Sequence, residues 1–244
     1  MGKVLKFQSA SPRPKLRGAL QRGELVRVWR SNLEDGSFCG YLAGMGKEWL
    51  LMWVVGDQIS FDGLYALRLA DISEVEAPDG HHVFIEKALA IRNIHPRLPR
   101  NFPLDDITQV VRAAAEYAAV MCVHVDTEDE HEVCYIGRPL GIEEDGFTLQ
   151  EITPDAEWLR EPSFFGWDEI STVSFDEPYA QVLLDVAGQP PRIDFAGSGF
   201  GTVSGDSGLG KAESFSFVIP DAASAKDGAS LPGDVVGPAE WRGG

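Results

Sequence analysis

The chain has 244 residues, 44% hydrophobic and 24% charged, which is the composition of a globular protein with one or two domains. Its 38 acidic and 21 basic residues give a formal charge of −17, which disfavours nucleic acid as a partner. No apolar run is long enough for a membrane helix, and the start lacks the apolar core of a secretory signal. Three cysteines favour a reducing cytoplasm over a disulfide scaffold.

The first segment, residues 1–23, carries six basic residues and no acidic one. Short charged termini are usually solvated, so we predict a flexible basic head. Contact with an anionic partner is the alternative role for this head. The sequence thus separates a basic start from a strongly acidic body.

Two similar sets of strands follow in chain order. Alternating or continuous apolar runs predict strands at 25–29, 37–44, 48–55 and near 66–76, and again at 121–126, 132–141, 146–152 and 164–174. Longer excursions, 56–66 and 153–166, precede the last strand of each set. We align Val26 with Val123, Cys39 with Cys134, Leu50 with Phe147 and Ile72 with Ile170. These spacings of 95 to 98 residues predict an internal repeat.

Amphipathic helices are predicted after each set, at 83–94 and 176–188, and between the sets at 104–119. Phe84, Ala88 and Ile91 share one helical face, and Tyr179, Val182, Leu183 and Val186 share another. Asp105 or Asp106 is placed to cap the middle helix, as Asp176 is for the last one. We therefore divide the chain into 1–23 (head), 24–96 (strands and helix), 97–119 (linker and helix), 120–188 (strands and helix) and 189–244 (a Gly-rich, mostly disordered tail).

The predicted fold class is mainly β with a few helices, as two tandem small bent-sheet barrels, each followed by an α-helix. The segment "CGYLAGMGKEWLLMW" at 39–53 resembles the Sm-like and SH3-like small barrels through Gly40, Leu42, Trp49 and Leu51. This resemblance implies an RNA site in the loop between the second and third strands. The positions of its Asp and Asn are Gly46 and Leu50 here, so those RNA-binding residues do not carry over. The layout also resembles a group of bacterial proteins with two tandem barrels, which implies no particular activity.

The residues that most resemble a chemical site are Cys122, His124, His131 and Cys134, a zinc-like set on a predicted hairpin. The favoured interpretation is that these cysteines are core residues, because Cys134 aligns with Cys39, which has no nearby histidine. The glycine-rich segment "SGDSGLG" at 204–210 resembles the sequence around the nucleophilic serine of trypsin-like proteases. That chemistry needs a histidine base, and no histidine follows position 131. We predict no catalytic residues, no metal and no cofactor.

Aromatic side chains in the two excursions are the predicted binding residues: Phe61, Tyr65, Trp158 and Phe164. Large rings often anchor protein partners. The alternative, held equally, is that they plug the ends of the barrels.

The predicted function is a non-enzymatic cytoplasmic protein that binds another protein, such as a bacterial adaptor or a toxin-neutralising protein. An Sm-like RNA-binding protein and an enzyme with a pocket between the barrels are the alternatives. We expect no membrane association. The sequence does not predict the partner's identity or the oligomeric state.

Overall fold

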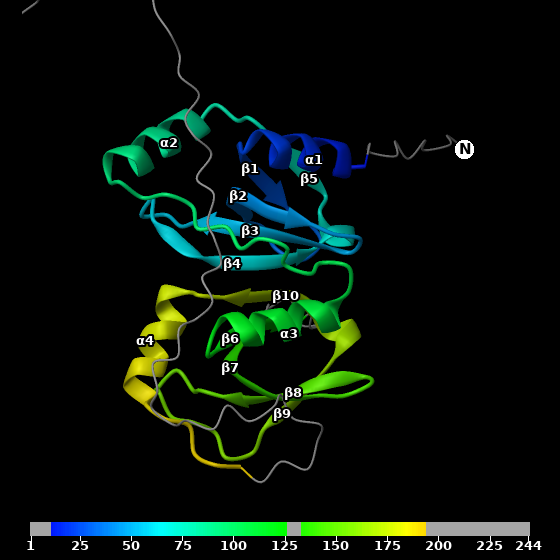
Figure 1. The fold of residues 1–244 in the computed structure, drawn as a ribbon, viewed down its shortest axis with the longest axis vertical. Coiled ribbons are helices and arrows are strands. Elements are labelled where there is room, and N and C mark those ends of the chain that lie inside the picture. The colour runs from blue at the N-terminus through cyan, green and yellow to red at the C-terminus, as the bar shows by residue number, and fades with distance from the viewer. Residues whose placement is uncertain (1–10, 126–132, 194–244) are drawn as a thin grey trace, which may run out of the picture.

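Among the residues that the structure describes, ten antiparallel strands form one continuous sheet in the order β5-β1-β2-β3-β4-β10-β6-β7-β8-β9 (Figure 1). The structure is a computed structural model that describes residues 11–125 and 133–193. The first set of strands comprises β1 (Leu25–Trp29), β2 (Ser37–Met45), β3 (Trp49–Val55), β4 (Phe61–Arg68) and β5 (Glu74–Glu76). The second comprises β6 (Met121–Val125), β7 (Val133–Ile142), β8 (Gly146–Glu151), β9 (Ser163–Gly166) and β10 (Ile170–Phe175). The helices are α1 (Arg13–Arg22), α2 (His82–Ile91), α3 (Ile107–Tyr117) and α4 (Pro178–Ala187).

The mainly-β class is confirmed, and a helix follows each set of five strands. Separate closed barrels are not formed, because β4 pairs with β10 of the other set, from Leu64 opposite Phe175 to Leu67 opposite Thr172. Figure 1 shows these two strands side by side at the junction of the halves. Backbone hydrogen bonds thus fuse the predicted barrels into one sheet.

The core lies on both sides of β3, every residue of which is buried. Trp49, Leu51 and Trp53 belong to one apolar cluster, whereas Leu50 and Met52 belong to another. Alternate side chains of a strand point to opposite faces, so β3 is covered on both. The larger cluster extends into the second half and includes residues of α2 and α3, while α1 covers the smaller one.

A glycine occurs at the same place in each set, where the second strand crosses closely over the third. A Cβ on Gly40 would lie 2.1 Å from the carbonyl oxygen of Trp53, and a Cβ on Gly137 would lie 2.2 Å from that of Gln150. A register shift follows each glycine, between Leu42 and Gly44 in β2 and between Pro139 and Gly141 in β7. Only glycine fits these close approaches.

The prediction that residues 1–23 form a flexible head is wrong for the part that the structure describes, because Arg13–Arg22 form α1. Leu16 and Ala19 are fully buried against the first set of strands, and Gly23 ends the helix in the left-handed conformation. Two of the basic side chains donate to backbone carbonyls: Arg13 to Gly46 and Lys15 to Val75. The basic charge of this segment therefore docks the helix. Residues 1–10 lie outside the described range.

The sequence pattern did not predict two strands, one in each excursion. Phe61–Arg68 form β4, and Ser163–Gly166 form β9. Gly63 and Pro162 interrupt the apolar alternation in these segments, which hides the pattern that identifies a strand. Each excursion therefore contributes a part to the sheet, residues 61–66 in the first and residues 163–166 in the second.

The segment between the halves docks on the turn between β2 and β3. The carbonyl of Leu104 accepts hydrogen bonds from the backbone of Glu48 and Trp49, and the carboxylate of Asp105 accepts one from the backbone of Lys47. Asp106 caps α3 by accepting a 2.9 Å hydrogen bond from the Gln109 backbone, which confirms one of the two predicted caps. Asp176 does not cap α4, since Glu177 holds the N-cap position without a side-chain bond.

Candidate functional site

The four predicted binding rings do not form a common groove. Phe61 and Tyr65 both lie on β4 but pack against different core clusters. The Phe61 ring stacks on Trp53 with centroids 4.9 Å apart, while the Tyr65 ring lies 5.4 Å from that of Phe38. Both rings are half-buried. Both rings contribute to the core faces of the sheet.

The other two rings belong to the second half. Trp158 follows β8 and donates a 3.0 Å hydrogen bond from Nε1 to the carbonyl of Gly188, just after α4. Phe164 lies on β9 opposite Thr148, and 48% of it is exposed. Trp158 is half-buried against the cluster under α4. Of the four, Phe164 is the most exposed, and Trp158 lines a hollow described below.

Three of the four zinc-like residues lie on adjacent strands. His124 of β6 is directly opposite Cys134 of β7, and Cys122 is opposite Ile136. Because alternate residues share a face, Cys122, His124 and Cys134 project from the same side of the hairpin. Cys122 is fully buried, whereas Cys134 is exposed. The fourth residue, His131, lies outside the described residues.

The strand register changes the alignment of the two cysteines. Gly40 and Gly137 make equivalent close approaches to the third strand of their sets. Cys39 precedes Gly40 and Ile136 precedes Gly137, so Cys39 corresponds to Ile136. Pairing across the first hairpin agrees: Arg27 opposite Cys39 matches Cys122 opposite Ile136, and Trp29 opposite Ser37 matches His124 opposite Cys134. Cys134 is therefore not the counterpart of Cys39, and the argument that it repeats as a core residue is wrong.

The two thiols of this cluster have opposite acid–base properties. A hydrogen bond from the Cys122 thiol, together with His124, lowers the pKa of Cys134 to about 6. The same hydrogen bond and burial raise the pKa of Cys122. A lowered pKa increases the thiolate fraction, which is the nucleophilic form. Among residues 11–125 and 133–193, no group of three or more His, Cys, Asp or Glu is arranged to hold a metal ion.

The adjacent histidines 81 and 82 lie at the entry to a helix. His81 is the N-cap residue of α2 and His82 its first residue. The His82 ring is almost completely buried; its Nδ1 accepts a 3.1 Å hydrogen bond from the Asp79 backbone, and its Nε2 lies 3.3 Å from the Asp79 carboxylate. Asp79 also pairs with Arg27 at 2.9 Å. This group anchors the start of α2 to β1.

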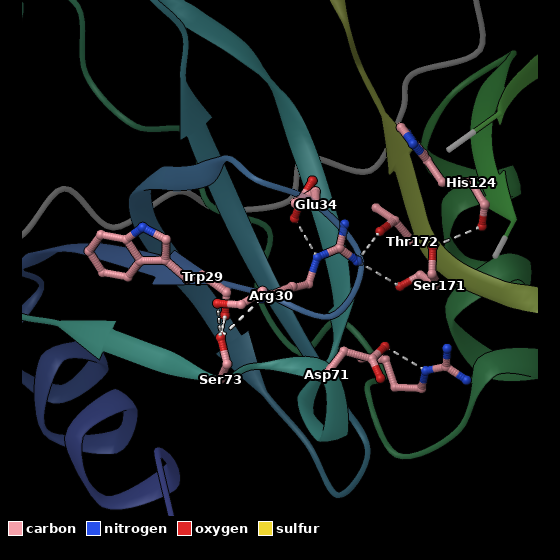
Figure 2. A network of polar contacts seen from close by, with 10 residues as sticks. Trp29, Arg30, Glu34, Asp71, Ser73, His124, Ser171 and Thr172 are labelled. Atoms are coloured by element: carbon pink, nitrogen blue, oxygen red, sulfur yellow. Dashed lines mark hydrogen bonds and ion pairs between the residues drawn. The ribbon is translucent and has the colours of Figure 1, made fainter. Parts of the chain in front are cut away.

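A buried arginine connects the two halves (Figure 2). Arg30, immediately after β1, donates a 2.6 Å hydrogen bond to Oγ1 of Thr172 and a 3.2 Å bond to the carbonyl of Ser171, both on β10. Its Nε donates to Glu34 at 2.8 Å. The backbone carbonyl of His124 accepts a 3.2 Å hydrogen bond from Ser171 in the same network. Sequence reasoning missed Arg30, because nothing local predicts that an arginine after a strand is fully buried.

The outward faces of two helices carry large apolar side chains that the strands do not cover. On α4, Ala180 and Leu183 are buried, but Tyr179, Val182 and Val186 are exposed, Val186 to 72%. We call these three residues the α4 stripe. On α2, Ile85 and Leu89 are buried, while Phe84 and Ile91 are exposed, Ile91 to 86%. The sequence identified both sets of apolar residues but not which of them face solvent.

Two hollows open beside α4. A small one of about 170 Å³ lies between the end of α3 and the start of α4 and is lined by Tyr117, Asp176 and Glu177, among others. A larger one of about 590 Å³ lies at the end of α4 and is lined in part by Arg138 and Trp158. Among the described lining residues of either hollow there is no Ser, Cys or His.

Several other sequence features lie outside the described residues. These are His131, "SGDSGLG" at 204–210 and the tail from residue 194 onward. Within the described ranges, no helix has the length and apolar character needed to cross a bilayer.

Comparison with known proteins gives no match to a family model, a curated protein or a solved structure. The resemblance of residues 39–53 to Sm-like small barrels therefore stays a prediction.

Proposed function

We propose that this is a non-enzymatic cytoplasmic protein that binds another protein through the α4 stripe. The observation that carries the proposal is that α4 is apolar on two sides, one buried and one exposed. A helix that only covered a core would have a polar outer face. Contiguous exposed apolar side chains usually mark a surface that another molecule covers.

The partner's chemistry is suggested by charge. The chain has an excess of 17 acidic groups, and long-range attraction favours a basic partner. On α4, Asp185 is exposed beside the stripe. A partner surface with apolar residues surrounded by Lys and Arg would match these features. A bacterial adaptor or a toxin-neutralising protein would use such a surface.

We also propose that the chain is a duplication of one Sm-like or SH3-like bent sheet. The equivalent glycines 40 and 137, the register shifts that follow them and the helix after each set support this. Duplication would explain why α2 and α4 both have exposed apolar faces. The second face, Phe84 and Ile91, then gives the protein a further contact of the same kind.

The two alternative functions have less support. At the positions implied for RNA contacts, Leu50 is fully buried, and a Cβ on Gly46 would lie 2.2 Å from the carbonyl oxygen of Leu104. No room is left there for a base. For an enzymatic role, the smaller hollow offers the carboxylates of Asp176 and Glu177, but the described lining of neither hollow contains a Ser or Cys nucleophile.

The test is affinity capture from the native host followed by mass spectrometry, with the full chain as bait. The decisive variant is Tyr179→Ser/Val182→Ser/Val186→Ser. The matched control, Gln181→Ser, changes an exposed residue of the same helix outside the stripe. A protein that is captured by the native chain and the control, but not by the triple variant, is then purified and titrated.

We expect the triple variant to bind that purified protein at least about a hundredfold more weakly. The variant Phe84→Ser/Ile91→Ser reports separately on α2. Equal capture by the triple variant and the native chain contradicts the proposal. Enrichment of RNA that is abolished by salt would favour the RNA-binding alternative.

A further inference from the structure

The larger hollow is a groove with one positively charged group among its described lining residues. It lies between β7, the loop after β8 and the end of α4, and has a volume of about 590 Å³. Arg138 comes from β7, Trp158 from the loop, and Leu184 and Asp185 from α4. Charged, aromatic and aliphatic side chains therefore meet in one concave site, as in many ligand sites.

The Arg138 guanidinium is held in a fixed orientation by neutral groups. Its Nε donates a 2.8 Å hydrogen bond to Oε1 of Gln150, and its Nη2 donates a 3.3 Å bond to the carbonyl of Pro191. Gln150 is fully buried and is itself fixed, because its Nε2 donates to the carbonyl of Leu159 at 3.1 Å. The cation is thus positioned without being neutralised.

Trp158 supplies an apolar wall beside the cation. The guanidinium carbon of Arg138 lies 6.0 Å from the Trp158 ring centroid, at the outer limit of a cation–π contact. The indole N–H is used by Gly188, which fixes the ring. Leu184 lines the groove from α4. An apolar group in the groove would lie between an indole and an aliphatic side chain.

The charge of Arg138 has no counter-ion within the described part of the chain. No carboxylate there forms an ion pair with it, although the chain has 38 acidic residues. Asp185 lines the same groove, yet its Oδ1 accepts a 2.9 Å bond from Gln181. The Arg138 side chain is half-buried, and this burial lowers the pKa of its guanidinium. A partly desolvated cation that has no counter-ion among the described residues favours binding of an anion.

We propose that this groove binds a peptide carboxylate, with Nη1 of Arg138 as the donor and an adjoining apolar side chain against Trp158 and Leu184. Nε and Nη2 of Arg138 are used by Gln150 and Pro191, and Nη1 makes no hydrogen bond to any residue in 11–125 or 133–193. The carboxylate belongs either to an acidic side chain or to a chain terminus. The site is separate from the α4 stripe, because Leu184 and Asp185 occupy other positions around the helix, and it does not depend on the function proposed above.

The test is a titration of the full chain, isotopically labelled and at low salt, followed by the indole NMR signal of Trp158. The Trp158→Phe variant assigns that signal. The probes are N-acetyl-leucyl-aspartyl amide and its neutral isostere N-acetyl-leucyl-asparaginyl amide. A third probe, N-acetyl-leucyl-asparagine with a free carboxyl terminus, distinguishes a terminal carboxylate from a side-chain one. Either acidic probe supports the proposal if it binds about tenfold more tightly than the neutral one.

Variants separate a binding role of Arg138 from a purely structural one. Arg138→Gln is expected to abolish the preference for acidic probes, whereas Arg112→Gln, at an exposed position on α3, is expected to keep it. If Arg138→Gln fails to fold, Arg138→Lys replaces it and should reduce the preference, because lysine lacks the planar fork. Equal binding of acidic and neutral probes overturns the proposal, and so does no binding of any probe. A preference for acidic probes that survives the substitution of Arg138 also overturns it.

Discussion

Arg30 and Thr172 are joined by a 2.6 Å hydrogen bond in the fully buried interior, although they belong to opposite halves of the chain. The same guanidinium binds Glu34 and the carbonyl of Ser171. One side chain thus reinforces the backbone pairing of β4 with β10 at the junction of the two halves (Figure 2).

Replacing this arginine should destabilise the whole protein. We expect Arg30→Met to lower the free energy of unfolding by about 3 kcal/mol, because Glu34 and the Ser171 carbonyl lose a buried charged donor. Urea denaturation followed by circular dichroism measures the change. The matched control, Arg112→Met on the exposed face of α3, should stay within about 0.5 kcal/mol of the native chain. Equal stability of both variants would show that the buried bonds contribute nothing net.

The crossing glycines should be intolerant of the smallest side chain. Gly40→Ala and Gly137→Ala place a Cβ within 2.2 Å of a backbone carbonyl oxygen, so each should cost about 2 kcal/mol or more. Gly36→Ala is the matched control, since a Cβ there meets no atom within 4 Å. Thermal unfolding compares the three variants. Similar melting temperatures for Gly40→Ala and Gly36→Ala would contradict the close approach of β2 and β3.

The exposed thiol should be the first cysteine to react. Because the pKa of Cys134 is lowered to about 6, its alkylation by iodoacetamide should accelerate as the pH rises through that value. Cys39 and Cys122 are buried and should react only after unfolding. Peptide mass spectrometry measures the rate at each cysteine. His124→Phe should raise the midpoint, and a midpoint that is the same in the folded and the urea-unfolded chain would refute the lowered pKa.

Protonation of His82 should weaken the fold in mildly acidic solution. Burial lowers the pKa of His82 below its ordinary 6.5, and this outweighs the nearby Asp79 carboxylate. A group with a depressed folded pKa stabilises the protein above its unfolded pKa, and this stability is lost as the pH falls through the folded value. The free energy of unfolding should therefore decline as the pH falls below about 6.5.

The control for this pH dependence is His82→Asn, which keeps an acceptor near the Asp79 backbone but does not titrate. Its stability should be nearly flat in the same pH window. The hydrogen bond from Arg27 lowers the pKa of Asp79, so the contribution of that carboxylate is lost only at more acidic pH. An unchanged slope in His82→Asn would assign the dependence to other groups.

The sequence predicted six strands closely, including Leu25–Trp29, because their apolar alternation is local and strong. It missed β4, whose pattern Gly63 interrupts, and β9, which Pro162 immediately precedes. It also missed α1, because a basic segment resembles a solvated arm unless its carbonyl partners, such as Val75, are known. These failures have one physical cause: the segments depend on distant parts of the chain for their stability.

The candidate sites show the same limit. Periodicity identified Tyr179, Val182 and Val186 as one side of α4, but only the packing of Leu183 determines that this side is exposed. The alignment of Cys39 with Cys134 relied on identical residues, whereas pairing across β6 and β7 matches Cys39 to Ile136. The sequence predicted Trp158 as a binding residue but not Arg138, because only the folded sheet brings these two side chains together.

The pairing of β4 with β10 has a consequence for biosynthesis. During translation β4 emerges long before β10, so its outer backbone groups remain unpaired until the ribosome has released the chain through Phe175. An unpaired, largely apolar strand edge readily joins the edge of another polypeptide. Premature termination between the halves would therefore yield an aggregation-prone fragment, not a smaller working protein.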